Sequence, residues 1–213
     1  MKGRIAIFLH QPYCSVQSGN GIMRALGSHY NFKIFTRHDL EADFFDDVDM
    51  VAFPGGLGDA SNFEFLMRES GDRIREFVIN GGAYLGICMG AYWAGSEYFN
   101  LLKDVDAEQY ITRPGADTRR PHAKNIKVNW DGVDTEMFFY DGCALVGSGK
   151  YDTIATYSNG DPMAIIQNKI GLIGCHPESE NHWYESYSWM KGKYHQGSHY
   201  PLLLDFVDAI IKK

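Results

Sequence analysis

The sequence predicts an α/β protein with a mostly parallel sheet that helices cover on both faces. Short apolar segments alternate with amphipathic segments through the first half of the 213 residues, and glycines follow several of the apolar segments. Alternation of strands and helices is typical of a parallel sheet buried on both faces. In the second half, apolar segments lie closer together, between Gly, Asn and Asp residues, which predicts additional antiparallel strands.

The first half contains four apolar segments of strand length. We expect these strands at residues 4–9, 32–36, 49–53 and 83–87, and helices at 21–30, 71–80 and 89–96. Residues 74, 77 and 78 are apolar, which is helical spacing, and Gly81 and Gly82 are residues that commonly end a helix.

The second half is expected to contain six short strands and a final amphipathic helix. The strands are expected at residues 126–130, 136–140, 144–146, 152–157, 163–167 and 170–174, and the helix at 202–211. No repeat, low-complexity tract or linker interrupts the chain, so one domain over residues 1–213 is predicted.

Composition and charge exclude several classes of protein. Apolar residues make up 45% of the chain and its formal net charge is -7, so it lacks the basic surface expected of a protein that binds nucleic acid or an anionic membrane. No apolar stretch reaches the length of a membrane span, and the N-terminus does not resemble a signal peptide. A cytoplasmic location is therefore expected, with Cys14, Cys88, Cys143 and Cys175 as free thiols, because none of them forms a CxxC pair.

Residues 86–90 form a G-x-C-x-G pattern directly after an apolar strand. Such a pattern is typical of a nucleophile elbow, a strained turn from strand to helix that exposes Cys88. Gly86 and Gly90 would let the backbone segments approach closely, and the helix N-terminus would favour the thiolate. The alternative is a buried cysteine at a tight corner, and this segment by itself does not decide between the two.

The tripeptide His176-Pro177-Glu178 follows the last predicted strand. A thiol nucleophile needs a base, and histidine titrates in the useful range. Positions i and i+2 of an extended segment share a face, so Glu178 is placed to orient His176. Cys175 would then point to the opposite face, into the core. Taken by itself, the tripeptide is more typical of a surface turn.

A glycine loop follows the predicted third strand. Gly55 and Gly56 come after Pro54, and glycines at the carboxyl end of a strand let backbone N–H groups approach a ligand. Together with the N–H of Met89, these groups are candidates for an oxyanion hole. A plain glycine turn is the alternative.

Two further residues are candidates for the substrate pocket. Asp59 follows the glycine loop and Tyr92 follows the nucleophile, although a helix cap and core packing are the simpler roles for them. A metal site formed by His182, His195 and His199 with the nearby glutamates is disfavoured, because Gly192, Gly197 and Pro201 oppose a regular helix there. No metal and no cofactor are expected.

The order of these segments resembles the class I glutamine amidotransferase superfamily. The stretches that carry the resemblance are residues 51–56, 74–94, 127–130, 151–160 and 171–178, so it spans most of the chain. It is strongest for the branch found as the N-terminal domain of some biotin–protein ligases and as stand-alone bacterial and phage proteins. The resemblance implies a flavodoxin-like three-layer α/β/α sandwich and a Cys–His–Glu triad of Cys88, His176 and Glu178.

The resemblance also implies an activity, namely acyl transfer from an amide through a thioester on Cys88. The expected partners are a small-molecule amide or the subunit of a partner enzyme. We find no synthetase domain and no biotin-binding loop, so ligase activity is not expected of this chain. The alternative function is a binding or regulatory module that retains the fold, because fold does not fix function.

Overall fold

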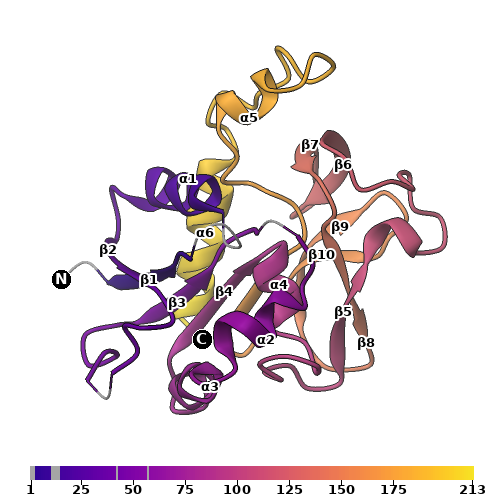
Figure 1. Cartoon of the computed structure of the whole chain (residues 1–213). Helices are drawn as coiled ribbons and strands as arrows, with labels where there is room; N and C mark the ends of the chain where they lie inside the picture. Colours follow the sequence, from indigo (N-terminus) through magenta and orange to yellow (C-terminus); the bar gives the residue numbers. More distant parts are fainter. Residues whose placement is uncertain (1–2, 11–14, 42, 57) are drawn as a thin grey trace.

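The helices and strands follow one another in the order shown in Figure 1. The computed structural model describes residues 3–10, 15–41, 43–56 and 58–213. The strands are β1 (Arg4–Phe8), β2 (Asn31–Phe35), β3 (Met50–Phe53), β4 (Ala83–Ile87), β5 (Val105–Gln109), β6 (Lys124–Trp130), β7 (Val133–Phe139), β8 (Cys143–Gly147), β9 (Asp152–Tyr157), β10 (Pro162–Gln167) and β11 (Ile170–Ile173). The helices are α1 (Val16–Leu26), α2 (Asn62–Met67), α3 (Gly71–Ile79), α4 (Met89–Trp93), α5 (Asn181–Glu185) and α6 (Tyr200–Ile211), with a short 3-10 helix η1 (Tyr110–Thr112).

The main sheet joins a parallel half to an antiparallel half. Its strand order is β2-β1-β3-β4-β11-β10-β9-β6-β7. Pairing is parallel from β2 to β11 and antiparallel from β11 to β7. A separate antiparallel pair consists of β5 and β8. The predicted mixture of parallel and antiparallel strands is therefore confirmed.

Two hydrophobic cores lie on opposite faces of the sheet, because side chains alternate along a strand. In β1, Ile5 and Ile7 contribute to one core and Ala6 and Phe8 to the other. Helices α1 and α6 cover the first face, while α2, α3 and α4 cover the second (Figure 1). The result is the three-layer α/β/α sandwich that the sequence predicts.

Most predicted elements agree with the observed ones to within a few residues, but the first helix does not. It was expected at residues 21–30, and α1 begins at Val16 instead. The reason is the N-cap, because the Ser15 side chain accepts a hydrogen bond of 3.2 Å from the N–H of Ser18. Elements α2, α5 and β5 were not predicted. Cys14 and Leu57 lie outside the described residues.

The parallel half brings four chain segments to one edge of the sheet. Strands β1, β3, β4 and β11 point the same way, so the segments that follow them meet at their carboxyl ends. The glycine loop follows β3, Cys88 follows β4, and the His176 segment follows β11. This edge is therefore where a site built from those segments would form.

Candidate active site

Cys88 lies at the turn between β4 and α4, in a conformation that side chains rarely adopt. Its backbone angles are φ 51° and ψ -105°, which is a strained combination for a residue with a Cβ. The N–H of Cys88 donates to the carbonyl of Ile173 at 2.8 Å, and its own carbonyl accepts from Ala91 and Tyr92 at 2.9 and 3.1 Å. The turn is thus fixed from both sides and has the geometry of a nucleophile elbow.

The two glycines of the pattern are required by close backbone contacts. A Cβ on Gly90 would lie 1.9 Å from the carbonyl oxygen of Phe53, and one on Gly86 would lie 2.4 Å from the carbonyl oxygen of Gly90. Both distances are far below van der Waals contact, so no larger residue fits without moving the backbone. The sequence pattern therefore reflects the packing of α4 against β3 and β4.

His176 and Glu178 form a buried pair beside this turn. The backbone N–H of His176 donates to the carbonyl of Phe138 at 2.9 Å, and its Nδ1 donates to Oε1 of Glu178 at 2.8 Å. His176 is 6% exposed and Glu178 is fully buried. Cys175 is also fully buried and belongs to a hydrophobic core, which confirms the core position predicted for it.

The imidazole of His176 interacts electrostatically with Cys88 as well as with Glu178. Burial lowers the pKa of His176, but the negative charges of Glu178 and Cys88, with hydrogen bonds to both side chains, raise it to about 10. The structure thus brings Cys88 together with His176 and Glu178, which lie far from it in the chain. The raised pKa favours the protonated imidazole.

Ser18 is a further member of this arrangement that the sequence did not reveal. Its hydroxyl donates to Oε1 of Glu178 at 2.6 Å and accepts the N–H of Gly55 at 3.0 Å. Ser18 is fully buried. Within a helix a serine gives no catalytic signal, and only the packing of α1 on this edge places it there. A Cβ on Gly21 of the same helix would lie 2.2 Å from the Glu178 carbonyl oxygen, so the contact between α1 and this segment is tight.

The three predicted oxyanion donors differ in their surroundings. The N–H of Gly55 donates to Ser18 and is therefore already used within the site. Gly56 and Met89 line the same cleft as Cys88. Met89 is the first residue of α4, where backbone N–H groups have no partner within the helix. The N–H groups of Gly56 and Met89 remain the predicted donors.

A cleft of about 710 Å³ opens over Cys88. It is lined by residues from the glycine loop, α4, the ends of β5 and β7, and the segment around α5: Ser15, Gln17, Ser18, Gly55, Gly56, Gly58, Asp59, Ala60, Cys88, Met89, Tyr92, Tyr98, Gln109, Phe138, Tyr140, Asp141, His176, Trp183, Ser186 and Tyr187. Both predicted pocket residues are among them. Gln109 and Asp141, which the sequence did not single out, also line it.

Asp59 and Tyr92 also make structural contacts. Asp59 accepts the N–H of Ser61 at 2.8 Å in the turn before α2, which matches the simpler helix-start role. The hydroxyl of Tyr92 donates to the carbonyl of Asp141 at 3.2 Å. Burial, with the charges of Cys143, Cys88 and Asp141, raises the pKa of Tyr92. Tyr92 therefore connects α4 to the segment after β7, which also lines the cleft.

The histidines near the C-terminus do not form a ligand set with the glutamates. His195 and His199 stack with ring centroids 4.2 Å apart, and the ring nitrogens of His195 bond the carbonyl of Ser179 and the N–H of Gly197. Across the described residues, no three His, Cys, Asp or Glu side chains come together as metal ligands would.

No helix in the described part of the chain combines the length and the apolar character that a membrane span requires.

Comparisons with known proteins find sequences that are similar to this chain. Residues 13–113 match the model of the biotin–protein ligase N-terminal family. A biotin–protein ligase from Schizosaccharomyces pombe is 28% identical over an alignment of 163 residues that covers 61% of this chain and 25% of that ligase. The chain therefore corresponds to about a quarter of that relative.

Solved structures show the fold. A glutamine amidotransferase from Thermotoga maritima superposes with a TM-score of 0.69 at 13% identity, over 100% of both chains. One from Methylobacillus flagellatus gives 0.61 at 13% identity, over 100% of this chain and 90% of that one. The chain therefore has the class I glutamine amidotransferase fold and resembles, in its sequence, the N-terminal domain of biotin–protein ligases.

Proposed function

We propose that this protein is a cysteine-dependent amide hydrolase that works by acyl transfer through Cys88, His176 and Glu178. The observation that carries the proposal is the position of the His176 imidazole, which is hydrogen-bonded to the Glu178 carboxylate, interacts electrostatically with Cys88 and lines the same cleft as Cys88. Buried side chains with strongly shifted pKa values, gathered in a cleft, are typical of active sites.

In the first half of the reaction the Cys88 sulfur would attack the carbonyl carbon of the amide. The oxygen would become an oxyanion facing the N–H groups of Gly56 and Met89. His176 would then give its Nε2 proton to the leaving nitrogen, the C–N bond would break, and a thioester would remain on Cys88.

In the second half a water molecule would attack the thioester. His176, now neutral, would take a proton from the water, the carboxylic acid would leave, and the thiolate would be restored. Glu178 would hold the imidazole in one orientation throughout, because its Oε1 accepts from Nδ1. The chemistry needs no cofactor, and free thiols of this kind suit a reducing compartment such as the cytoplasm.

A second candidate function is a binding or regulatory module, whose partner would be another enzyme subunit. It is favoured by the relative from Schizosaccharomyces pombe, in which the similar region is only a quarter of a protein named as a ligase. In that case the cleft would bind a metabolite or a partner segment without turnover.

Alkylation of Cys88 separates the two functions. Purified protein would be treated with iodoacetamide at pH 7, and the labelled cysteine would be located by peptide mass spectrometry. A catalytic thiolate should react at least ~10-fold faster than glutathione, and His176→Asn should remove most of that advantage. Release of ammonia from primary amides by the wild type, and not by Cys88→Ala, would then identify substrates. A Cys88 no faster than glutathione, and unaffected by His176→Asn, would contradict the hydrolase and favour the regulatory module.

A further inference from the structure

The lining of the cleft includes a carboxylate that an amide side chain holds in place. Asp141 follows β7, and both of its carboxylate oxygens accept hydrogen bonds from the Nε2 of Gln109, at 3.0 and 2.8 Å. Both residues line the cleft and are partly buried. Gln109 is neutral, so the negative charge of Asp141 has no cationic side chain among the contacts described for it.

Aromatic rings make up much of the remaining wall. Phe138, Tyr140 and Trp183 line the cleft together with Tyr92, Tyr98 and Tyr187. The described lining contains no lysine and no arginine, and His176 is its one basic side chain. Aromatic faces attract cations, and a carboxylate among them adds a full negative charge. An anionic ligand would find no ion-pair partner here apart from the catalytic imidazole.

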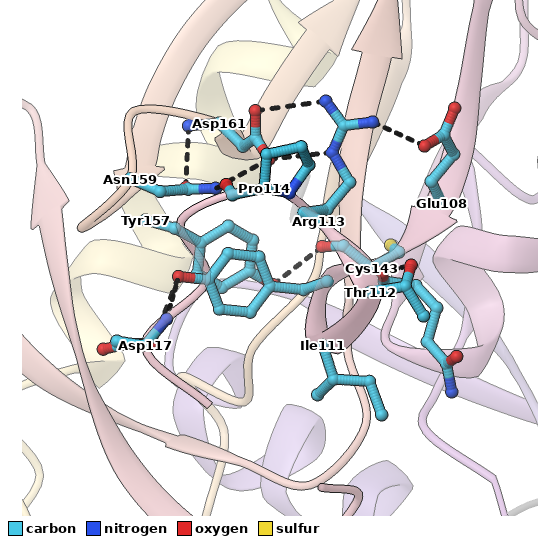
Figure 2. A network of polar contacts seen from close by, with 12 residues as sticks. Glu108, Ile111, Thr112, Arg113, Pro114, Asp117, Cys143, Tyr157, Asn159 and Asp161 are labelled. Carbon is cyan, nitrogen blue, oxygen red and sulfur yellow. Dashed lines mark hydrogen bonds and ion pairs between the residues drawn. The ribbon is translucent and has the colours of Figure 1, made fainter. Parts of the chain in front are cut away.

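The platform behind Gln109 and Asp141 is rigid. β5 ends at Gln109, which is in register with Cys143 of β8, and the N–H of Tyr110 donates to the carbonyl of Gly142 at 3.1 Å. Figure 2 shows the adjoining network, in which Arg113 contacts both Asp161 and Glu108. Its tyrosine rings, Tyr110 and Tyr157, stack with centroids 3.7 Å apart. Asp141 and its amide partner therefore present a preorganised acceptor.

We propose that this cleft selects amides that carry an ammonium or guanidinium group, which the Asp141 carboxylate and the aromatic wall hold while the amide carbonyl lies at Cys88. The inference rests on the proposed function and names its substrate class. Tyr92 connects the two groups in space, because it lies on α4, which begins directly after Cys88, and its hydroxyl donates to the carbonyl of Asp141 at 3.2 Å. Burial raises the pKa of Asp141 above its ordinary value and the Gln109 hydrogen bond offsets only part of the rise, so a bound cation would favour the ionised carboxylate.

The test compares three methanethiosulfonate reagents that modify a thiolate by the same reaction. The thiolate attacks the sulfenyl sulfur, a mixed disulfide forms on Cys88, and methanesulfinate leaves. The reagents carry a trimethylammonioethyl group, a sulfonatoethyl group or a neutral methyl group. Rates at Cys88 would be measured by peptide mass spectrometry and divided by the rates for 2-mercaptoethanol, which removes intrinsic differences between the reagents.

The wild type should prefer the cationic reagent over the anionic one by about tenfold, and 0.5 M salt should reduce the preference. Asp141→Asn should lower the ratio of the cationic to the anionic rate at least ~3-fold, while the rate with the neutral reagent should stay within about 2-fold of the wild-type rate. Asp205→Asn is the matched control, because it removes the same charge from an exposed position on α6 and should leave the ratio unchanged.

Two outcomes would overturn the proposal. One is a wild-type protein that shows no preference for the cationic reagent, a result that needs no variant to fold. The other is an Asp141→Asn variant whose ratio matches that of Asp205→Asn. Failure of the proposed hydrolase would look different, since Cys88 would then react slowly with the neutral reagent whatever the charge preference.

Discussion

The hydroxyl of Ser18 lies 2.6 Å from Oε1 of Glu178, the same oxygen that accepts the Nδ1 proton of His176 at 2.8 Å. One carboxylate oxygen thus receives two hydrogen bonds from elements at opposite ends of the chain. The other oxygen of Glu178 is buried and has no hydrogen-bond partner among the described residues. The orientation of the imidazole therefore depends on this single oxygen, and Ser18 is a positioning residue.

Replacing Ser18 by Ala should slow the alkylation of Cys88 about tenfold and lower the free energy of unfolding by about 2–3 kcal/mol, because it leaves the buried Gly55 N–H without its acceptor and leaves Oε1 of Glu178 with the His176 hydrogen bond alone. Iodoacetamide labelling and urea unfolding measure the two effects. Ser28→Ala, just beyond the end of α1 and exposed, is the control and should change neither. Retention of wild-type labelling by Ser18→Ala, with its stability reduced, would limit Ser18 to a structural role.

Replacing Glu178 by Gln should lower the pKa of His176. Burial already lowers this pKa, and the charge of Glu178 is the largest of the effects that raise it to about 10. Titration of the His176 ring nitrogens by NMR measures the change. Glu185→Gln on α5 removes the same charge from an exposed residue and should leave the titration unaltered.

The raised pKa of His176 also predicts how stability depends on pH. The folded-state pKa of about 10 lies above the ordinary value of 6.5, so the pair contributes stability that is complete below pH 6.5 and declines as the pH rises through 10. Denaturant unfolding between pH 7 and 10 should show a steeper loss in the wild type than in Glu178→Gln. Equal slopes would mean that His176 is not held in its charged form.

Replacing Cys88 by Gly should give a more stable protein than replacing it by Ala. Alanine keeps the Cβ that makes φ 51° and ψ -105° unfavourable, whereas glycine adopts these angles freely. Glycine also loses more conformational entropy on folding, which offsets part of this gain. The glycine variant should therefore exceed the alanine variant in free energy of unfolding by about 1 kcal/mol. Urea unfolding of the two variants measures it, and an alanine variant as stable as the glycine variant would show that the turn is not strained.

Replacing Gly90 by Ala should destabilise the protein by about 3 kcal/mol, since the added methyl group would overlap the carbonyl of Phe53. Gly71 in α3 is the matched control. An added Cβ there would meet its nearest neighbour at 3.6 Å, an ordinary contact, so Gly71→Ala should stay within about 1 kcal/mol of the wild type. Thermal or urea unfolding of both variants makes the comparison, and equal stabilities would be inconsistent with close packing at the elbow.

The sequence by itself determined the fold class and the segments that carry the candidate chemistry. Short apolar runs such as residues 83–87 are typical of strands that are buried on both faces. The glycines on either side of Cys88 predict the turn, because only small residues fit there. The sequence also predicted the pairing of His176 with Glu178, since residues two apart on an extended segment share a face.

Only the tertiary structure decided which distant groups complete the site. Ser18, Gln109 and Asp141 carry no local signal, and they reach the cleft because the parallel strand order and the β5–β8 pair bring their segments to one edge of the sheet. The early start of α1 followed from a cap at Ser15 that the apolar pattern does not encode. Local sequence sets turns and periodicity, whereas contacts between segments more than a hundred residues apart depend on the packing of the whole sheet.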